Sequence, residues 1–378
     1  MKVEFYKHQL DERAKRAVSE VLDTPFLTSG PVTRAFEERS RQYFEVDYFR
    51  SSSSCTSAMF LALKGWGIGP GDEVLVPAMT FIATANVVLH AGATPVLVDV
   101  ESDSGLIDPT YLDQHITART KAIIPVHLYG AMCDVERLKK AADNHSLKIL
   151  EDCAHCFEGS RNGIRPAQLG DAAAFSFYAT KNLASGEGGG LATNDLQLAE
   201  KFESMRQHGM SKSAHDRYSG NFKHWDMIEL GYKENMFDIQ AALLMTQFED
   251  IESKIKRREA ISQYYESEFS NAGIAFPVVP HGVKSARHLF TVWAKNGARD
   301  AVIEAMIRRN VGVAVNYRAL HQTTFYKELL KLGAGALPVA SRIGNETLTI
   351  PLYPNLTDEE VEYVTKSVIQ SFEECHAI

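Results

Sequence analysis

Two side chains with complementary chemistry follow short apolar runs in this sequence. Lys181 comes soon after the run 172–177, and a glycine-rich stretch at 186–190 follows it. Asp152 ends a second run, 147–152. Short apolar runs bounded by turn residues are typical of buried strands. The sequence therefore predicts a lysine and an aspartate at the ends of two strands.

Side chains at the carboxyl ends of parallel strands line the crevice in which open α/β sheets bind ligands. A lysine there can form a Schiff base with a carbonyl compound, and an aspartate can pair with a protonated ring nitrogen. These are the two protein groups that pyridoxal 5'-phosphate (PLP) chemistry needs. A lysine beside glycines is more often a solvated loop charge. It is therefore the pair, rather than Lys181 alone, that indicates a cofactor site.

The elements around this pair alternate in type. Apolar runs at 46–50, 73–77, 94–98 and 122–126 predict further strands, and helices are expected at 32–44 and 195–208 among others. Alternating strands and helices favour a doubly wound parallel sheet. A hydroxyl-rich segment, Ser51–Ser57, runs directly into the apolar stretch 58–63 and predicts a helix N-terminus. Unpaired N–H groups and the helix dipole there favour a phosphate, although simple N-capping explains the serines equally.

Several motifs together resemble one family. Asp152-Cys153-Ala154-His155, the stretch Ser176–Asn182 and Gly186-Glu187-Gly188-Gly189 closely resemble the DegT-type PLP-dependent sugar-nucleotide aminotransferases, which are fold type I aminotransferases. The resemblance runs from Thr28 to Pro354. It implies an α/β fold with a large PLP-binding domain, built on a mostly parallel seven-stranded-type sheet between helices. A smaller α+β C-terminal domain follows.

The domain boundary is expected at residue 250. Residues 1–250 would form the large domain with an N-terminal arm, and 251–378 the small domain, entered by a long, charge-rich helix at about 250–271. Within the small domain we expect a strand at 287–292 and a helix at 301–310. The long polar stretch 211–224 is predicted to be an active-site loop.

The resemblance assigns roles to individual residues. It implies PLP held as an internal aldimine on Lys181, with Asp152 at the pyridine nitrogen. His155 would bond the phenolic oxygen of PLP or orient Asp152. The catalytic residues would be Lys181, Asp152 and His155. The cofactor-binding residues would be Cys55, Thr56, Ser57, Phe81, Asp152, His155, Ser176, Lys181 and Asn235, with Thr56 and Ser176 on the phosphate and Phe81 stacked on the ring.

The segment 231–238 departs from the family pattern. Many members carry Asn and Arg where this chain has Lys233 and Asn235, and the Lys-x-Asn version resembles the branch that aminates a UDP-4-keto-pentose in lipid modification. In relatives this element enters the neighbouring subunit's cofactor site, which implies a homodimer with shared active sites. Either residue could reach the neighbour's phosphate, and we favour Asn235.

The resemblance also predicts the substrates. An amino group would pass from an amino acid, L-glutamate, to a keto sugar nucleotide, a 4-keto sugar, for surface polysaccharide or lipid modification. Tyr317, Arg318 and His321 lie in a segment that relatives use near the substrate, although a structural role suits Arg318 and His321 equally. One alternative is a sugar dehydratase of the same family, in which histidine replaces the lysine. A catalytically silent regulatory or binding relative is another, but Lys181, Asp152, Ser176 and Thr56 are all present.

Composition excludes other classes. The 378 residues are 45% hydrophobic and carry a formal net charge of −8 without a basic run, so neither nucleic acid nor a membrane is an expected partner. The N-terminus lacks a signal-like apolar region, and the five cysteines have no framework spacing, which favours a cytoplasmic protein. Cys153 and Cys156 form a C-x-x-C, but a zinc site needs a second ligand pair. We expect no metal and small buried thiols there.

Overall fold

A seven-stranded sheet forms the centre of the molecule. The computed structural model describes residues 1–211, 224–333 and 335–378. The strands lie in the order β1-β8-β7-β5-β4-β2-β3, and all neighbours are parallel except β8, which runs antiparallel to β1 and β7. The bounds are β1 Tyr48–Ser52, β2 Glu73–Pro77, β3 Thr94–Val98, β4 Thr120–Ile123, β5 Lys148–Asp152, β7 Ala172–Ser176 and β8 Gly189–Thr193. The predicted mostly parallel seven-stranded sheet is confirmed.

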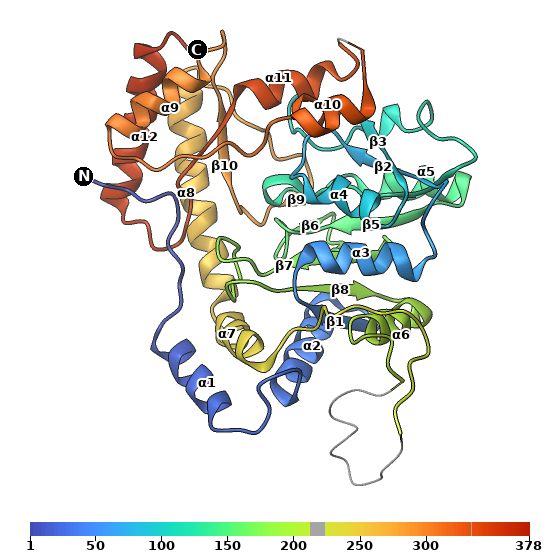
Figure 1. Ribbon diagram of the computed structural model, residues 1–378. Helices are drawn as coiled ribbons and strands as arrows, with labels where there is room; N and C mark the ends of the chain where they lie inside the picture. Colours follow the sequence, from blue (N-terminus) through green and yellow to red (C-terminus); the bar gives the residue numbers. More distant parts are fainter. Residues whose placement is uncertain (212–223, 334) are drawn as a thin grey trace.

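Helices cover this sheet (Figure 1). Strands such as β2 and β8 are buried along their whole length, as expected when both faces of a parallel sheet are covered. The helices of this part are α1 Glu12–Leu22, α2 Pro31–Phe44, α3 Cys55–Gly65, α4 Ala83–His90, α5 Val135–His145, α6 Leu196–Met205 and α7 Asp238–Phe248. Short 3-10 turns lie at η1 Pro109–Tyr111 and η2 Leu128–Gly130.

A second apolar cluster lies in the C-terminal part, beside the long helix α8 (Ile251–Asn271). It packs a two-stranded antiparallel sheet, β10 and β11, against helices, which matches the predicted α+β layer. The remaining bounds are β6 Ser160–Arg161 paired with β9 Val283–Lys284, β10 Phe290–Trp293, α9 Arg299–Arg308, η3 Leu320–Gln322, α10 Thr324–Leu330, α11 Pro338–Glu346, β11 Thr347–Ile350 and α12 Asp358–Glu374.

The two parts of the chain are closely joined. Residues of η3, α10 and α11, including Leu320, Tyr326 and Ile343, belong to the same apolar cluster as the central sheet. The division at residue 250 stays a prediction. In Figure 1 the C-terminal helices lie above the sheet and the N-terminus runs back to them. Among the described residues, no helix is long and apolar enough to cross a membrane.

Two strands begin later in the structure than the sequence predicts. The strand expected at 287–292 begins only at Phe290, because the backbone before it bonds elsewhere: Ala286 N donates to Gly130 O at 2.9 Å and His288 N to Tyr129 O at 3.0 Å. The strand expected at 46–50 is shifted to Tyr48–Ser52. Both shifts arise from contacts with residues distant in sequence.

The predicted glycine-rich loop after Lys181 ends in a strand. Gly189 and Gly190 belong to β8, where an added Cβ would come within 2.2 Å of Ser54 and 2.5 Å of Phe49, respectively. Glycine at 189 therefore lets the N-terminus of α3 approach the sheet closely.

Candidate active site

Lys181 lies in the turn that follows β7. Its backbone N–H donates to Tyr178 O at 2.8 Å, and Phe177 N and Ala179 N bond Gly188 and Gly186, so the turn is tied to the glycine-rich segment. Within the described part of the chain, the amine has no hydrogen-bond or ion-pair partner. Burial lowers the pKa of Lys181 to about 8, against the opposing effect of Cys55 and Asp152. An unpaired amine with this pKa is partly uncharged near neutral pH.

Asp152 ends β5, the strand beside β7. Only 4% of the residue is exposed. Its Oδ2 accepts from Thr84 Oγ1 at 2.8 Å and its Oδ1 from Ala154 N at 3.1 Å. None of the described Lys, Arg or His side chains bonds it, and burial raises its pKa. A buried carboxylate without a cation is suited to receive a ligand's positive charge.

His155 is held as a neutral ring by two contacts. Its Nδ1 accepts from Tyr129 N at 3.2 Å, so the proton lies on Nε2, which faces Tyr317 Oη at 3.0 Å. Burial, with a smaller effect of Lys181, keeps the pKa of His155 well below its usual range. No hydrogen bond joins His155 to Asp152. The part of the prediction in which His155 orients Asp152 is thus not supported, and Thr84 and Ala154 hold the carboxylate.

The serine-rich segment forms the N-terminus of α3. Ser54 is the N-cap, and it forms a capping box with Ser57, whose N–H donates to Ser54 Oγ at 3.0 Å. The Ser57 N–H is therefore not available to a phosphate, contrary to our expectation. In the described structure the N–H groups of Cys55 and Thr56 and the Thr56 hydroxyl have no partner. These three donors point to an anion cradle at the helix start.

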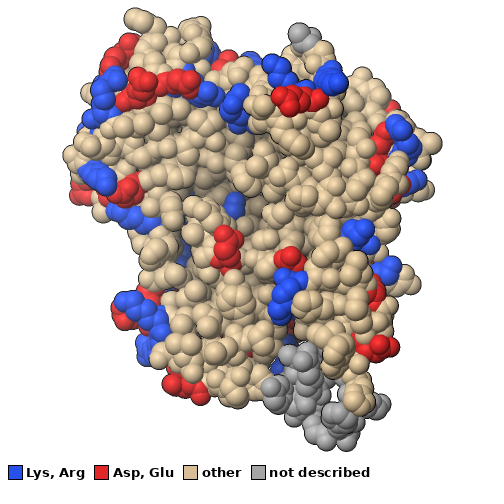
Figure 2. Space-filling view, viewed as in Figure 1, with Lys and Arg blue, Asp and Glu red and all other residues tan. Residues whose placement is uncertain are grey.

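The other predicted ligand residues lie around these groups. Phe81 is 51% exposed and its ring lies 5.5 Å from that of Tyr317. Ser176, at the end of β7, lines the same recess as Lys181 and His155. Figure 2 shows this face of the molecule hollowed between the C-terminal helices and the helices below, with mostly uncharged residues around the hollow.

Three of the predicted site residues form hydrogen bonds with other residues of the protein. Arg318 is exposed and donates to Gln322 O at 3.2 Å. His321 Nε2 bonds Ser341 Oγ of α11 at 2.8 Å, a structural contact. Asn235 donates to Ser29 Oγ at 2.8 Å and accepts from Lys233 Nζ at 2.6 Å, so Lys233 and Asn235 bond each other. The predicted loop 211–224 lies almost wholly outside the described residues.

His288 and Asn182 are site residues that the sequence analysis missed. His288 is 4% exposed, packs on the His155 ring with centroids 4.6 Å apart, and lines the recess of Lys181. Its Nδ1 lies 3.2 Å from Asn182 Oδ1. Asn182 follows Lys181 directly, which was a usable signal, but nothing near position 288 in the sequence indicates a site.

The cysteines of the C-x-x-C lie in separate environments. Cys153 belongs to the apolar cluster around Phe175, whereas Cys156 lies with Met132 and Val135, and its Sγ is 3.4 Å from Gly130 O. Both thiols are buried, and burial raises their pKa well above the usual range. Unreactive, protonated thiols agree with the packing role predicted for them.

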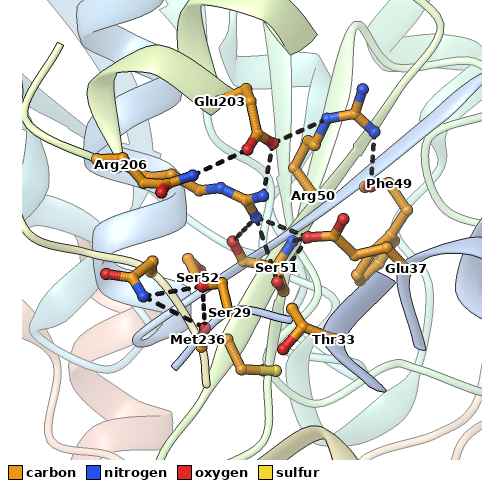
Figure 3. A network of polar contacts seen from close by, with 12 residues as sticks. Ser29, Thr33, Glu37, Phe49, Arg50, Ser51, Ser52, Glu203, Arg206 and Met236 are labelled. Carbon is orange, nitrogen blue, oxygen red and sulfur yellow. Dashed lines mark hydrogen bonds and ion pairs between the residues drawn. The ribbon is translucent and has the colours of Figure 1, made fainter. Parts of the chain in front are cut away.

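A buried ion-pair network supports the serine-rich segment (Figure 3). Arg206 Nη1 donates to Glu37 Oε1 at 2.7 Å and to Ser51 O, and Glu37 accepts from Ser51 N at 2.9 Å. Glu203 bonds both Arg206 and Arg50. Burial would raise the pKa of Glu37, but Arg206 and Ser51 outweigh it and the net pKa is lowered. The network fixes the end of β1, three residues before α3 begins.

We predict that Arg206→Met lowers the free energy of unfolding by about 3 kcal/mol, because it leaves the Glu37 carboxylate buried without a cation. Urea denaturation measures this change. Glu37→Gln in the same chain should restore part of the loss. Lys139→Ala, which removes a surface pair with Asp143, should have a much smaller effect. Equal effects of Arg206→Met and Lys139→Ala would contradict the prediction.

Comparisons with known proteins agree with this architecture. Residues 8–369 match the DegT/DnrJ/EryC1/StrS aminotransferase family. The spore coat polysaccharide biosynthesis protein SpsC of Bacillus subtilis is 39% identical over 358 residues, covering 93% of this chain and 92% of SpsC. The putative sugar aminotransferase Spr1654 from Streptococcus pneumoniae, in its PMP form, has a TM-score of 0.93 at 30% identity, covering 99% and 100% of the two chains. PseC of Helicobacter pylori, an aminotransferase involved in pseudoaminic acid biosynthesis, has a TM-score of 0.92 at 28% identity, covering 99% and 100%.

The fold is that of the fold type I PLP enzymes. The chain belongs to the DegT/DnrJ/EryC1/StrS aminotransferase family and is a PLP-dependent sugar aminotransferase. The residues present fit PLP: Asp152 is a buried carboxylate that lacks a cation, and the start of α3 offers unpaired donors for a phosphate. Lys181 is an unpaired amine suited to an aldehyde.

Proposed function

We propose that this enzyme transfers the amino group of L-glutamate to a keto sugar nucleotide, a 4-keto sugar, in the cytoplasm, for surface polysaccharide or lipid modification. The proposal rests on two groups: the unpaired amine of the half-buried Lys181, in the turn after β7, and the buried carboxylate of Asp152, which has no cation and ends the adjacent strand β5. The printed functions of SpsC and PseC, in polysaccharide and pseudoaminic acid biosynthesis, support the substrate class.

In this proposal each residue of the candidate site has its own role. Lys181 would hold PLP covalently and, when released, carry a proton, which its pKa of about 8 permits near neutral pH. Asp152 would keep the ring nitrogen of PLP protonated, and PLP, when bound, supplies the electron sink for a carbanion. The Thr56 hydroxyl and the N–H groups of Cys55 and Thr56 would bind the phosphate. Ser176 would add a further hydroxyl, and Phe81 would stack on the ring.

The His155 ring would present a fixed tautomer to the substrate side of the site. Because Tyr129 N occupies Nδ1, the Nε2–H can donate, here to Tyr317 Oη. Tyr317, which contacts both His155 and the exposed ring of Phe81, is the best placed of the three predicted substrate residues. The roles of Arg318 and His321 toward sugar or diphosphate stay predictions.

Glutamate-dependent amination of a panel of keto sugar nucleotides tests the proposal. We expect 2-oxoglutarate to form together with an amino sugar nucleotide from a 4-keto member of the panel. Deoxygenation without consumption of glutamate would indicate the dehydratase alternative, which Lys181 opposes. No reaction with any member, in protein shown to bind PLP, would favour a silent relative.

We further propose a homodimer with shared active sites. Large apolar side chains are exposed in and near the segment 231–238, among them Leu27, Trp225, Ile228, Leu230 and Phe237. Exposed apolar groups in such number favour a protein interface. The segment also contacts the serine-rich segment before α3 in its own chain, because Ser53 N donates to Glu234 O at 2.7 Å.

Asn235→Ala is expected to weaken PLP retention, because the amide would lose its phosphate contact in the neighbour and leave Lys233 without its acceptor. Mixing this variant with Lys181→Ala should restore some activity, since hybrid dimers contain one site with both residues intact. Subunit exchange is verified by mass spectrometry of differently tagged chains. If exchange occurs and no activity returns, the sites are not shared.

A further inference from the structure

Asn182 has a defined orientation that determines the state of His288. Its Nδ2 donates to Glu158 Oε2 at 3.0 Å and to Ala286 O at 2.8 Å, so both amide protons have acceptors. Its Oδ1 therefore faces His288 Nδ1, at 3.2 Å, as an acceptor. A nitrogen that faces an acceptor carries the proton. His288 is thus protonated at Nδ1, and its Nε2 has a free lone pair if the ring is neutral.

The surroundings keep the His288 ring neutral and fixed. Its backbone is held on both sides, since His288 N donates to Tyr129 O at 3.0 Å and Arg258 Nη1 donates to His288 O at 3.2 Å. Burial, followed by the charges of Lys181, His155 and Arg258, lowers its pKa well below the usual range. In the described part of the chain, Nε2 has no hydrogen-bond partner, although the residue is only 4% exposed.

The recess in front of His288 is shared with Lys181. The lining of this recess includes His155, Ser176, Lys181, Asn182 and His288. Among the residues that the structure describes, Lys181 Nζ is a donor without an acceptor, and His288 Nε2 is an acceptor without a donor. Asn182 constrains both residues: it follows Lys181 directly in the chain, and it is hydrogen-bonded to His288. The two groups are complementary in chemistry, and the residues that carry them line the same small recess.

We propose that His288 Nε2 accepts a hydrogen bond from the amino group of Lys181 whenever this lysine is not bound to the cofactor. His288 is then a positioning residue: it holds the released amine within the recess, beside Asp152 and His155. The proposal depends on the proposed role of Lys181 as the lysine that holds PLP. It adds a hydrogen-bond partner for the amine during the part of the catalytic cycle in which the lysine is not bound to the cofactor.

Labelling of the apoprotein tests the contact without turnover. A short pulse of a small acylating reagent between pH 6.5 and 10, with quantification of the Lys181 peptide by mass spectrometry, gives the pH at which the amine loses its proton. The pKa of about 8 applies to the amine without a hydrogen-bond partner, so the proposed contact should place the wild-type midpoint above 8. The facing groups are Asp152 and Cys55, which raise the pKa of Lys181, and the neutral rings of His155 and His288. Glu158, whose pKa burial raises to about 6, is mainly charged over this range and fully charged near the midpoint.

His288→Phe keeps a ring against His155 but removes the acceptor. Because a neutral acceptor stabilises the ammonium form, its loss should lower the midpoint by about one pH unit. His288→Gln offers a carbonyl oxygen at a similar reach and should return the midpoint toward the wild-type value. A midpoint unchanged in His288→Phe, in a variant that unfolds at the wild-type temperature, would overturn the proposal.

A second measurement uses only the wild-type protein, so it does not depend on whether a variant folds. In wild-type apoprotein labelled with 15N-histidine, the His288 signals should show a protonated Nδ1 and an unprotonated Nε2, and a protonated Nε2 would overturn the proposal. Borohydride trapping of PLP on wild-type Lys181 tests the role of Lys181 separately from the role of His288. If trapping fails, the role of Lys181 is wrong; if trapping succeeds and the midpoint does not move, only the role of His288 is wrong.

Discussion

Lys181→Ala is expected to abolish turnover and covalent attachment of PLP while the protein remains folded. In the proposed site Lys181 both attaches the cofactor and carries the proton, so its removal should reduce the rate by several orders of magnitude. Turnover is measured with glutamate and the best keto sugar nucleotide from the panel. Turnover at the wild-type rate by this variant would contradict the entire assignment.

Lys181→Ala is also expected to change the stability of the apoprotein. Without a hydrogen bond to its amine, Lys181 has a pKa of about 8 in the folded chain, against about 10.4 in an unfolded chain. The charged lysine therefore costs stability below pH 8, by at most about 3 kcal/mol, and this cost disappears as the pH rises through 10.4. Lys181→Ala apoprotein should be more stable than wild type at pH 7, and the difference should shrink toward pH 10.5. Lys139→Ala, at the surface, is the matched control.

Asp152→Asn is expected to retain the covalently bound cofactor and lose most catalysis. In the proposed site, attachment depends on Lys181 and the phosphate cradle, which the change does not touch. Holding a proton on the ring nitrogen depends on the carboxylate charge, since opposite charges about 4 Å apart interact by about 4 kcal/mol at an effective dielectric of 20. Losing half of this would slow proton abstraction by more than tenfold.

The single-turnover rate at which glutamate bleaches the bound cofactor measures this effect, at matched PLP occupancy. Thr84→Val provides a graded control, because it removes one hydrogen bond to Asp152 Oδ2 and keeps the charge. We expect its rate to lie between those of wild type and Asp152→Asn. A wild-type rate for Asp152→Asn would show that this carboxylate is structural.

The sequence was sufficient to predict the sheet and the position of Asp152 at the end of β5, because the apolar runs of β5 and β7 are local signals. Lys181, predicted at a strand end, lies in the turn that follows β7. The sequence also predicted the start of α3, since a serine before an apolar stretch is a local capping pattern. It could not show which donors remain unpaired there. That the Ser57 N–H is used by Ser54 depends on the geometry of the cap.

The missed features depend on contacts between distant segments. His288 lines the recess of Lys181, and its position depends on residues 286–288, which bond Tyr129 and Gly130 instead of continuing β10. Glycines 189 and 190 are unfavourable in a strand by propensity, and only the close approach of Ser54 and Phe49 explains their place in β8. The engagement of His321 with Ser341 has the same origin. No local pattern encodes these pairings.

One measurement tests the central claim most directly. The PLP-loaded wild-type protein is reduced with borohydride, with and without prior addition of L-glutamate, and the peptides are mapped by mass spectrometry. We predict a phosphopyridoxyl group on Lys181 without glutamate and its loss after glutamate, together with release of pyridoxamine phosphate and 2-oxoglutarate. A label on another lysine, or a label on Lys181 that glutamate does not diminish, would contradict the assignment of Lys181 as the cofactor-binding lysine of a glutamate-dependent aminotransferase.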